Sequence, residues 1–241
     1  MEADCVGGSG TEIGISDMEN ETLAQEVVKT AQALSALGLN VNKAGNVSVR
    51  CQREGVAGFL ITPTGVAYET LQPEDLPWMP IKQGLTLEDF VGHYLPSSEW
   101  QMHAAVYETR ADVQAVVHTH SAYATALACQ NLRIPAFHYM VAVAGGSSID
   151  VVPYATFGSE ALAKGAALGL AKKNACLLEH HGVMAVGVSL ARALALVHEV
   201  ENLAHQYVIV RSLGEPRLIS EEEMARVAAK FTTYGQPQSR Q

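Results

Sequence analysis

The sequence predicts a fold that combines strands and helices, in the α/β or α+β class. Short apolar runs rich in valine, leucine and isoleucine alternate along the chain with longer stretches in which apolar residues recur at helical spacing. Of the 241 residues, 48% are hydrophobic and 17% are charged, so the chain can bury a substantial core. Because no internal linker is visible, we expect one domain over residues 16–241, preceded by a loose glycine-rich tail over residues 1–15.

The elements expected in the N-terminal part follow from caps, breakers and spacing. Ser16 and Asp17 can cap a first helix whose apolar residues keep helical spacing, and Gly38 can end it. After this helix we expect strands over 46–50 and 58–62, a turn over 63–65 and an irregular, proline-containing stretch over 70–96.

The rest of the chain continues the alternation of helix and strand. Ser97 and Ser98 precede one helix and Ser189 precedes a long one, as is typical of N-cap residues. In order, we expect a helix from residue 97 onward, a strand over 113–117, a helix over 122–128, extended chain over 149–152, a helix over 159–172, strands over 175–178 and 183–186, and helices over 189–213 and 220–231. This pattern leaves the order of the strands open.

Charge and composition limit the classes of partner. The net charge of -9 argues against nucleic acid or an anionic membrane as the main partner, and a phosphorylated substrate would have to be held by local donors. No signal-peptide pattern and no apolar run close to 18 residues is visible. None of the four cysteines forms a C-x-x-C pair. We therefore expect a cytoplasmic protein.

A pair of histidines at a strand end is the strongest chemical signal. His118 and His120 are two residues apart, and alternate residues of a strand face the same side, so both imidazoles can hold one metal ion. A third imidazole can come from His180 or His181, which precede Gly182. Adjacent residues of an extended chain point to opposite sides, so we expect only one of these two to reach the metal. Three imidazoles and one open or carboxylate position are typical of catalytic zinc.

Glu99 is the candidate carboxylate, expected in the first turn of the helix that Ser97 and Ser98 precede. It either complements the helix dipole or works as a base beside a bound anion. The glycine and asparagine at 45–46 and the turn at 62–65 can offer backbone N–H groups, an amide and a hydroxyl. The other histidines are expected to be ordinary core or surface groups, including His103, which could simply pair with Glu99 on a helix face.

Six short motifs occur in order and carry a family resemblance. They are GNVSVR at 45–50, ITPTG at 61–65, SSEWQMH at 97–103, VHTHS at 117–121, PYATFG at 153–158 and HHG at 180–182. The set resembles the class II aldolase/adducin family, and within it the aldolases of the L-fuculose-1-phosphate type, from about residue 20 to the C-terminus. The resemblance implies α/β/α layers with a central, mainly antiparallel sheet, and a homotetramer with zinc sites at subunit interfaces.

The resemblance also implies roles for individual residues. His118, His120 and His181 correspond to the zinc ligands, and Glu99 corresponds to both a fourth ligand and the catalytic base. The residues that correspond to the phosphate site are Gly45, Asn46, Thr64, Gly65, Ser97 and Ser98. Tyr139 corresponds to a tyrosine that protonates the leaving aldehyde oxygen from a neighbouring subunit, whereas Phe157 and Tyr234 correspond to aromatic residues that shape and close the pocket.

The implied function is zinc-dependent cleavage of a ketose 1-phosphate to dihydroxyacetone phosphate and an aldehyde. The same family implies alternatives, namely a methylthioribulose-1-phosphate aldolase or dehydratase, a sugar-acid phosphate decarboxylase and a 4-epimerase. At the position of Glu99, the resemblance implies an aspartate for the epimerases, so the glutamate of this chain argues against a 4-epimerase. A non-enzymatic scaffold like the adducin head domain is a further alternative, but such a scaffold has no need of the histidine set.

Overall fold

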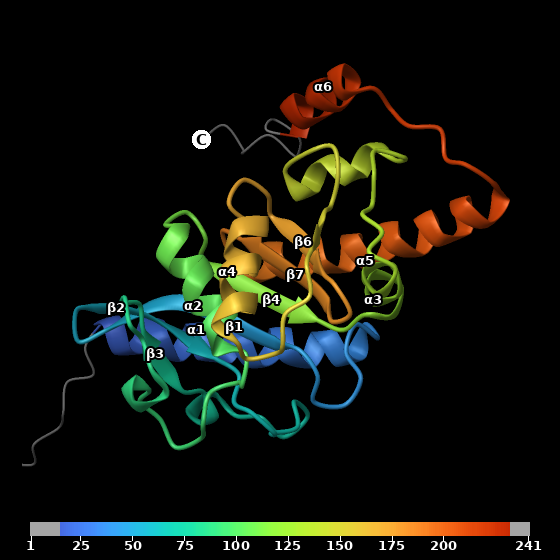
Figure 1. The fold of residues 1–241 in the computed structure, drawn as a ribbon. Coiled ribbons are helices and arrows are strands. Elements are labelled where there is room, and N and C mark those ends of the chain that lie inside the picture. Colours follow the sequence, from blue (N-terminus) through green and yellow to red (C-terminus); the bar gives the residue numbers. More distant parts are fainter. Residues whose placement is uncertain (1–14, 232–241) are drawn as a thin grey trace, which may run out of the picture.

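A single mixed sheet organises the computed structural model, which describes residues 15–231. Its seven strands lie in the order β3-β2-β1-β4-β7-β6-β5, and all neighbours are antiparallel except β5 and β6 (Figure 1). The strands are β1 (Asn46–Arg53), β2 (Val56–Ile61), β3 (Trp78–Pro80), β4 (Ala115–Thr119), β5 (Val151–Val152), β6 (Ala175–Leu178) and β7 (Gly182–Gly187).

Helices cover both faces of this sheet (Figure 1). The α-helices are α1 (Ile15–Ala36), α2 (Trp100–Thr109), α3 (Ala122–Cys129), α4 (Glu160–Gly169), α5 (Leu190–Leu213) and α6 (Glu221–Phe231). Three short 3₁₀ helices join them, namely η1 (Pro73–Asp75), η2 (Leu87–Asp89) and η3 (Tyr139–Ala144). Helices α1, α3 and α5 pack on one face of the sheet, and α2 and α4 pack on the other.

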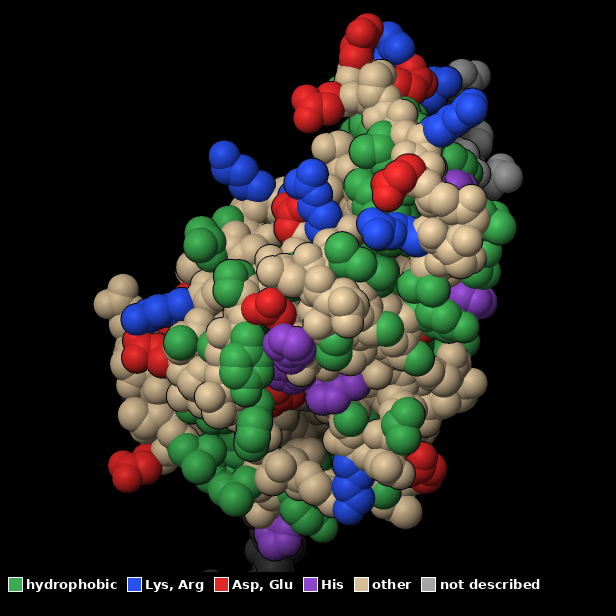
Figure 2. Space-filling view, turned by 45° about the vertical axis from the view of Figure 1, so that its right-hand side comes forward, with side chains coloured by type: hydrophobic (Ala, Val, Ile, Leu, Met, Phe, Trp, Pro, Cys, Tyr) green, Lys and Arg blue, Asp and Glu red, His purple; other side chains and the backbone are tan. Residues whose placement is uncertain are grey.

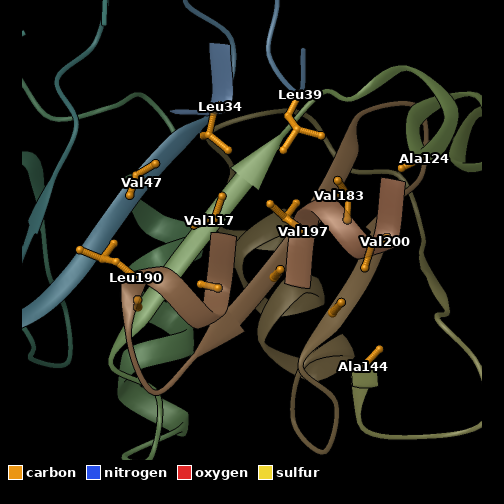
Figure 3. Packing of buried hydrophobic residues seen from close by; sticks show 14 of the residues in the cluster. Leu34, Leu39, Val47, Val117, Ala124, Ala144, Val183, Leu190, Val197 and Val200 are labelled. Carbon is orange, nitrogen blue, oxygen red and sulfur yellow. The ribbon is translucent and has the colours of Figure 1, made fainter. Parts of the chain in front are cut away.

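The alternation of side chains along β4 explains the three layers. Val117 points into a core shared with α1 and α5, whereas its neighbour Val116 points into the core under α2 and α4. Figure 3 shows Val117 beside Val47 of β1 and Val197 of α5, with their side chains directed toward one another. A strand that is apolar on both faces is expected when helices cover both sides of a sheet.

The predicted fold class is confirmed, with three α/β/α layers and a mainly antiparallel sheet. The cap of the long helix α5 is also confirmed, because Ser189 Oγ accepts a hydrogen bond from the Arg192 N–H. The prediction of an irregular stretch over 70–96 was wrong at β3, which is an edge strand that pairs with β2. Proline is tolerated at a sheet edge, which is why the proline content concealed this strand.

Two further boundaries differ from the prediction. Helix α2 begins at Trp100, so Glu99 is its N-cap residue and does not lie in the first turn. Residues 1–14 of the predicted tail lie outside the described residues, and Ile15 belongs to α1. Among the helices of the described part, none is both long and apolar enough to cross a membrane.

Candidate metal centre

Three strand ends meet at one edge of the sheet and position the predicted ligands. Asn46, the first residue of β1, pairs with His118 near the end of β4. On the other side of β4, Thr119 pairs with Val183 at the beginning of β7. His181 belongs to the tight turn between β6 and β7. The antiparallel register therefore brings the end of β4 next to the beginnings of β1 and β7.

Four side chains converge at this edge. Glu99, His118, His120 and His181 each direct one potential ligand atom to a common centre, and these atoms lie within 4.8 Å of one another. The three imidazole rings form a nearly equilateral triangle, with centroids 4.8, 4.8 and 4.9 Å apart. The carboxylate spans two of them, since Glu99 Oε1 lies 2.9 Å from His181 Nε2 and Oε2 lies 3.3 Å from His118 Nε2.

The hydrogen bonds around the cluster leave lone pairs directed inward. His118 Nδ1 lies 2.9 Å from the Val183 carbonyl oxygen, which can only accept, so this nitrogen carries the proton and Nε2 of a neutral ring does not. That Nε2 faces His120 Nε2 at 2.9 Å. Within the described residues, buried Glu99 Oε1 has no hydrogen-bond partner despite its proximity to His181. An orphaned carboxylate oxygen among inward-facing nitrogens fits a bound metal cation.

The pKa shifts favour the protonation states that metal binding requires. Burial opposes the charge of Glu99, but the adjacent imidazoles of His118 and His181 outweigh it and hold the pKa of Glu99 far below its ordinary value. Burial, together with the charges of His118 and His181, lowers the pKa of His120 to about 4. At neutral pH the site therefore contains an ionised carboxylate and a neutral His120, as metal ligation demands.

The backbone around the third histidine explains which of the adjacent pair joins the cluster. His180 has a φ of 54°, and its exposed ring lies edge-on to Tyr154, with centroids 6.0 Å apart. This turn directs His181 inward. The next residue, Gly182, passes so close to β4 that a Cβ would lie 2.3 Å from the Thr119 carbonyl oxygen. The third imidazole can approach only because residue 182 has no side chain.

A cavity of about 340 Å³ opens beside the cluster. It is lined by the whole predicted phosphate set, namely Gly45, Asn46, Thr64, Gly65, Ser97 and Ser98. An isolated bridge between Pro63 and Pro96 holds the two loops of this set side by side, and Asn46 Nδ2 donates to Glu99 Oε2 at 3.0 Å. Figure 2 shows histidine side chains gathered beside a hollow on this face of the molecule. Three members of the cluster, Glu99, His120 and His181, thus open into the same space as the polar loops.

The aromatic predictions have different outcomes. Phe157 lines the cavity and is 67% exposed. Tyr139 begins η3, is 49% exposed, and is not among the described residues that line the cavity of its own chain. It lies nearly parallel to the ring of Phe231. Tyr234 lies outside the described residues. The catalytic and ligand roles assigned to these and the other site residues stay predictions.

Sequence reasoning missed two residues near the site. Lys43 and Tyr154 line the cavity, and the Lys43 ammonium donates to the Gly65 carbonyl oxygen. Lys43 stands two residues before Gly45, so its position in the same loop was the available signal. The pairing of His103 with Glu99 that their spacing allowed is not formed. His103 is completely buried, and its ring bonds to the side chains of residues 46 and 48 of β1.

Comparison with known proteins agrees with this geometry. Residues 25–208 match the family model described as Class II Aldolase and Adducin N-terminal domain. The chain is 45% identical over 223 residues to L-fuculose phosphate aldolase of Escherichia coli strain K12, covering 90% of this chain and 98% of the relative. It is also 43% identical over 213 residues to 5-methylthioribulose-1-phosphate/5-deoxyribulose-1-phosphate aldolase of Rhodospirillum rubrum, covering 88% and 92%.

A solved structure shows the same similarity. The structure of an L-fuculose 1-phosphate aldolase superposes with a TM-score of 0.81 at 38% identity, covering 92% of this chain and all of the other. The family model, the relatives and the fold agree over most of the chain. The protein therefore belongs to the class II aldolase and adducin family, and within that family it is a lyase.

Proposed function

We propose that this protein is a zinc-dependent aldolase that cleaves a ketose 1-phosphate to dihydroxyacetone phosphate and an aldehyde, with L-fuculose 1-phosphate as the first candidate substrate. The observation that carries the proposal is that three members of the cluster, Glu99, His120 and His181, line the same cavity as the neutral groups predicted to bind phosphate. The names of the relatives at 45% and 43% identity support the same class of substrate.

Zinc is the proposed metal, held by His118, His120, His181 and Glu99. Three nitrogen ligands and one carboxylate suit its preference for tetrahedral N and O coordination. A zinc ion bound there would polarise substrate oxygens and stabilise the negative charge that develops as the carbon–carbon bond breaks.

The phosphate group is proposed to bind at the loops that carry Gly45, Asn46, Thr64, Gly65, Ser97 and Ser98, called the cradle loops below. Ser97 and Thr64 supply hydroxyls, Asn46 supplies an amide, and the glycines allow the backbone to approach. Among the described residues that line the cavity, Lys43 is the one lysine or arginine. In a protein of net charge -9, we propose that its ammonium is the local positive charge that a phosphate dianion requires.

Glu99 is proposed as the base. In the direction of synthesis it removes a proton from the carbon next to the carbonyl of dihydroxyacetone phosphate. Asn46 holds Oε2, whereas Oε1 lacks a hydrogen-bond partner among the described residues. Oε1 is therefore the proposed metal ligand in the free enzyme, and after substrate displaces it from the metal it is the oxygen that accepts this proton. We propose that Tyr139 of a neighbouring copy protonates the new alkoxide, because its exposed phenol lies away from the cavity of its own chain. This role requires the expected homotetramer, which we propose works in the cytoplasm.

A second candidate substrate class is 5-deoxyribulose 1-phosphate and its methylthio analogue. The Rhodospirillum relative carries these names, and the cavity offers two exposed aromatic rings, Tyr154 at 59% and Phe157 at 67% exposure. Such rings suit an apolar end group on the aldehyde half of the substrate. A deoxy sugar such as fuculose also ends in a methyl group, so both candidates fit this feature.

The test is a panel assay on the zinc-loaded protein. L-fuculose 1-phosphate, 5-deoxyribulose 1-phosphate and 5-methylthioribulose 1-phosphate are compared by kcat/KM, with enzymatic detection of dihydroxyacetone phosphate. We expect cleavage of at least one of them and little cleavage of unphosphorylated L-fuculose. The control is Glu99→Gln, which keeps the shape of the side chain but cannot accept the proton, and should turn over roughly 10²–10⁴-fold more slowly. Release of no dihydroxyacetone phosphate from any substrate, or an epimerised product, would contradict the proposal.

A further inference from the structure

A chain of buried hydrogen bonds runs from the interior of the protein to Glu99. Tyr107 OH lies 2.8 Å from Ser48 Oγ, and Ser48 Oγ lies 2.6 Å from His103 Nδ1. On the other side of the ring, His103 Nε2 lies 2.5 Å from Asn46 Oδ1, and Asn46 Nδ2 lies 3.0 Å from Glu99 Oε2. All five side chains are buried, with exposures of 7% or less.

Only one direction of donation satisfies every member of this chain. An ionised Glu99 can only accept, so Asn46 must present its NH₂ group to the carboxylate. The amide oxygen of Asn46 then faces His103 Nε2, which must carry the proton. In a neutral imidazole Nδ1 is therefore an acceptor, and the Ser48 hydroxyl donates to it. The oxygen of Ser48 in turn accepts from the Tyr107 hydroxyl.

The position of His103 keeps its ring neutral and in this tautomer. The partners of its two ring nitrogens are a hydroxyl and an amide, and no carboxylate of the described residues is bonded to either nitrogen. Burial, followed by the charge of His118, lowers the pKa of His103 to about 3, against a smaller opposing effect of Glu99. An interior hydrogen-bond chain with every group satisfied is rigid, since breaking one bond leaves buried polar atoms unpaired.

We propose that His103 is a positioning residue for the catalytic base. Its Nε2–H fixes the Asn46 amide with the NH₂ group toward Glu99 Oε2, which leaves Oε1 as the oxygen that accepts the substrate proton. Without this donor the amide can rotate by half a turn and place its oxygen against the carboxylate. The inference rests on the proposed role of Glu99 as base, and it assigns a function to a histidine that lies outside the metal cluster.

A matched pair of variants separates positioning from packing. In His103→Gln the longer amide can place its NH₂ group near the position of the imidazole Nε2 and still donate to Asn46. In His103→Asn the shorter amide reaches only the Nδ1 position, so Asn46 loses its donor. Both variants remove the ring and leave a polar amide. If the role of His103 were purely structural, the two substitutions would therefore reduce proton exchange to a similar extent.

The readouts are chosen so that zinc loss and base misplacement are seen separately. Zinc content, binding of inorganic phosphate and exchange of the C3 proton of dihydroxyacetone phosphate with deuterated water are measured for each variant. We expect normal zinc content in both, exchange within about fivefold of the unmutated rate for His103→Gln, and a loss of roughly 10–100-fold for His103→Asn, the range typical of residues that orient a site from behind. Equal loss of exchange in the two variants overturns the proposal.

Two further measurements keep the test decisive. Tyr107→Phe removes the hydroxyl at the far end of the chain but leaves the bonds from Ser48 to Glu99, so we expect a lower melting temperature and near-normal exchange. Loss of exchange as large as in His103→Asn would show that the chain acts through stability alone. Nitrogen-15 spectra of the unmutated protein should show His103 protonated at Nε2, and protonation at Nδ1 overturns the inference even if the variants do not fold. If the unmutated protein exchanges no proton, the proposed base role fails, whereas the tautomer still tests the direction of the chain.

Discussion

Replacing Gly182 by alanine should loosen the proposed metal centre although no proposed ligand is replaced. A Cβ at this position would lie 2.3 Å from the Thr119 carbonyl oxygen, 3.0 Å from His120 Cδ2 and 3.3 Å from His118 Cε1. Ordinary contact begins at 3.4 Å, so the nearest pair has to separate by about 1 Å. The crowded oxygen belongs to the backbone of β4, so the strands that carry the histidines have to move apart.

The size of the effect follows from this displacement. Overpacking of an interior site costs about 1–3 kcal/mol of folding stability. Misplacing groups that support a metal site weakens binding roughly 10–100-fold, which corresponds to about 1.4–2.7 kcal/mol. We therefore expect Gly182→Ala to fold with a modestly lower melting temperature and to bind zinc 10–100-fold more weakly.

Competition with a chromogenic zinc chelator measures the affinity directly. Gly146→Ala is the matched control, because its new Cβ would meet only the far end of the Lys173 side chain, at 3.4 Å from Cε and 3.9 Å from Nζ, and should leave zinc affinity unchanged. A Gly182→Ala protein with unchanged zinc affinity would refute the argument that the close approach of β7 to β4 builds the site. A variant that loses no zinc affinity but melts much lower would limit the role of Gly182 to packing.

Three further predictions concern the ligands, the phosphate and the pH dependence. His181→Ala should lose zinc in metal analysis while His180→Ala keeps it, and the reverse result would show that the wrong member of the pair was assigned. Ser97→Ala should raise the KM for phosphorylated ketoses. Lys43→Gln should also raise this KM, by an amount that shrinks with added salt. If both variants keep the KM of the unmutated protein at low salt, neither residue binds the phosphate. Because burial, then the charge of His118, lowers the pKa of His103 to about 3 from an unfolded value of 6.5, its contribution to stability is complete above pH 6.5 and is lost as pH falls toward 3. His103→Gln should therefore flatten acid unfolding in that window by up to about 1.4 kcal/mol per pH unit, and parallel acid profiles for the two proteins would contradict the assignment.

Local patterns in the sequence determined the fold class and the core of the candidate site. The spacing of His118 and His120 placed two imidazoles on one side of a strand end because side chains alternate at every residue of a strand. The caps, glycines and apolar runs located most helices and strands, since these are signals that a few neighbouring residues carry. The ordered motifs added the family, and with it the cradle loops that line the cavity.

The tertiary structure decided which distant residues meet. The strand order places Asn46 opposite His118 and brings the turn between β6 and β7 beside them. Only this arrangement shows that His181, and not His180, joins the cluster. The edge strand β3 forms because β2 offers it hydrogen bonds, which the local proline-containing sequence does not reveal. Hydrogen-bond partners more than fifty residues apart turn His103 from an ordinary histidine into the centre of a buried chain. Contacts of this kind depend on register across the sheet, and register is set by the packing of the whole domain, because shifting one strand by one residue would exchange its two faces.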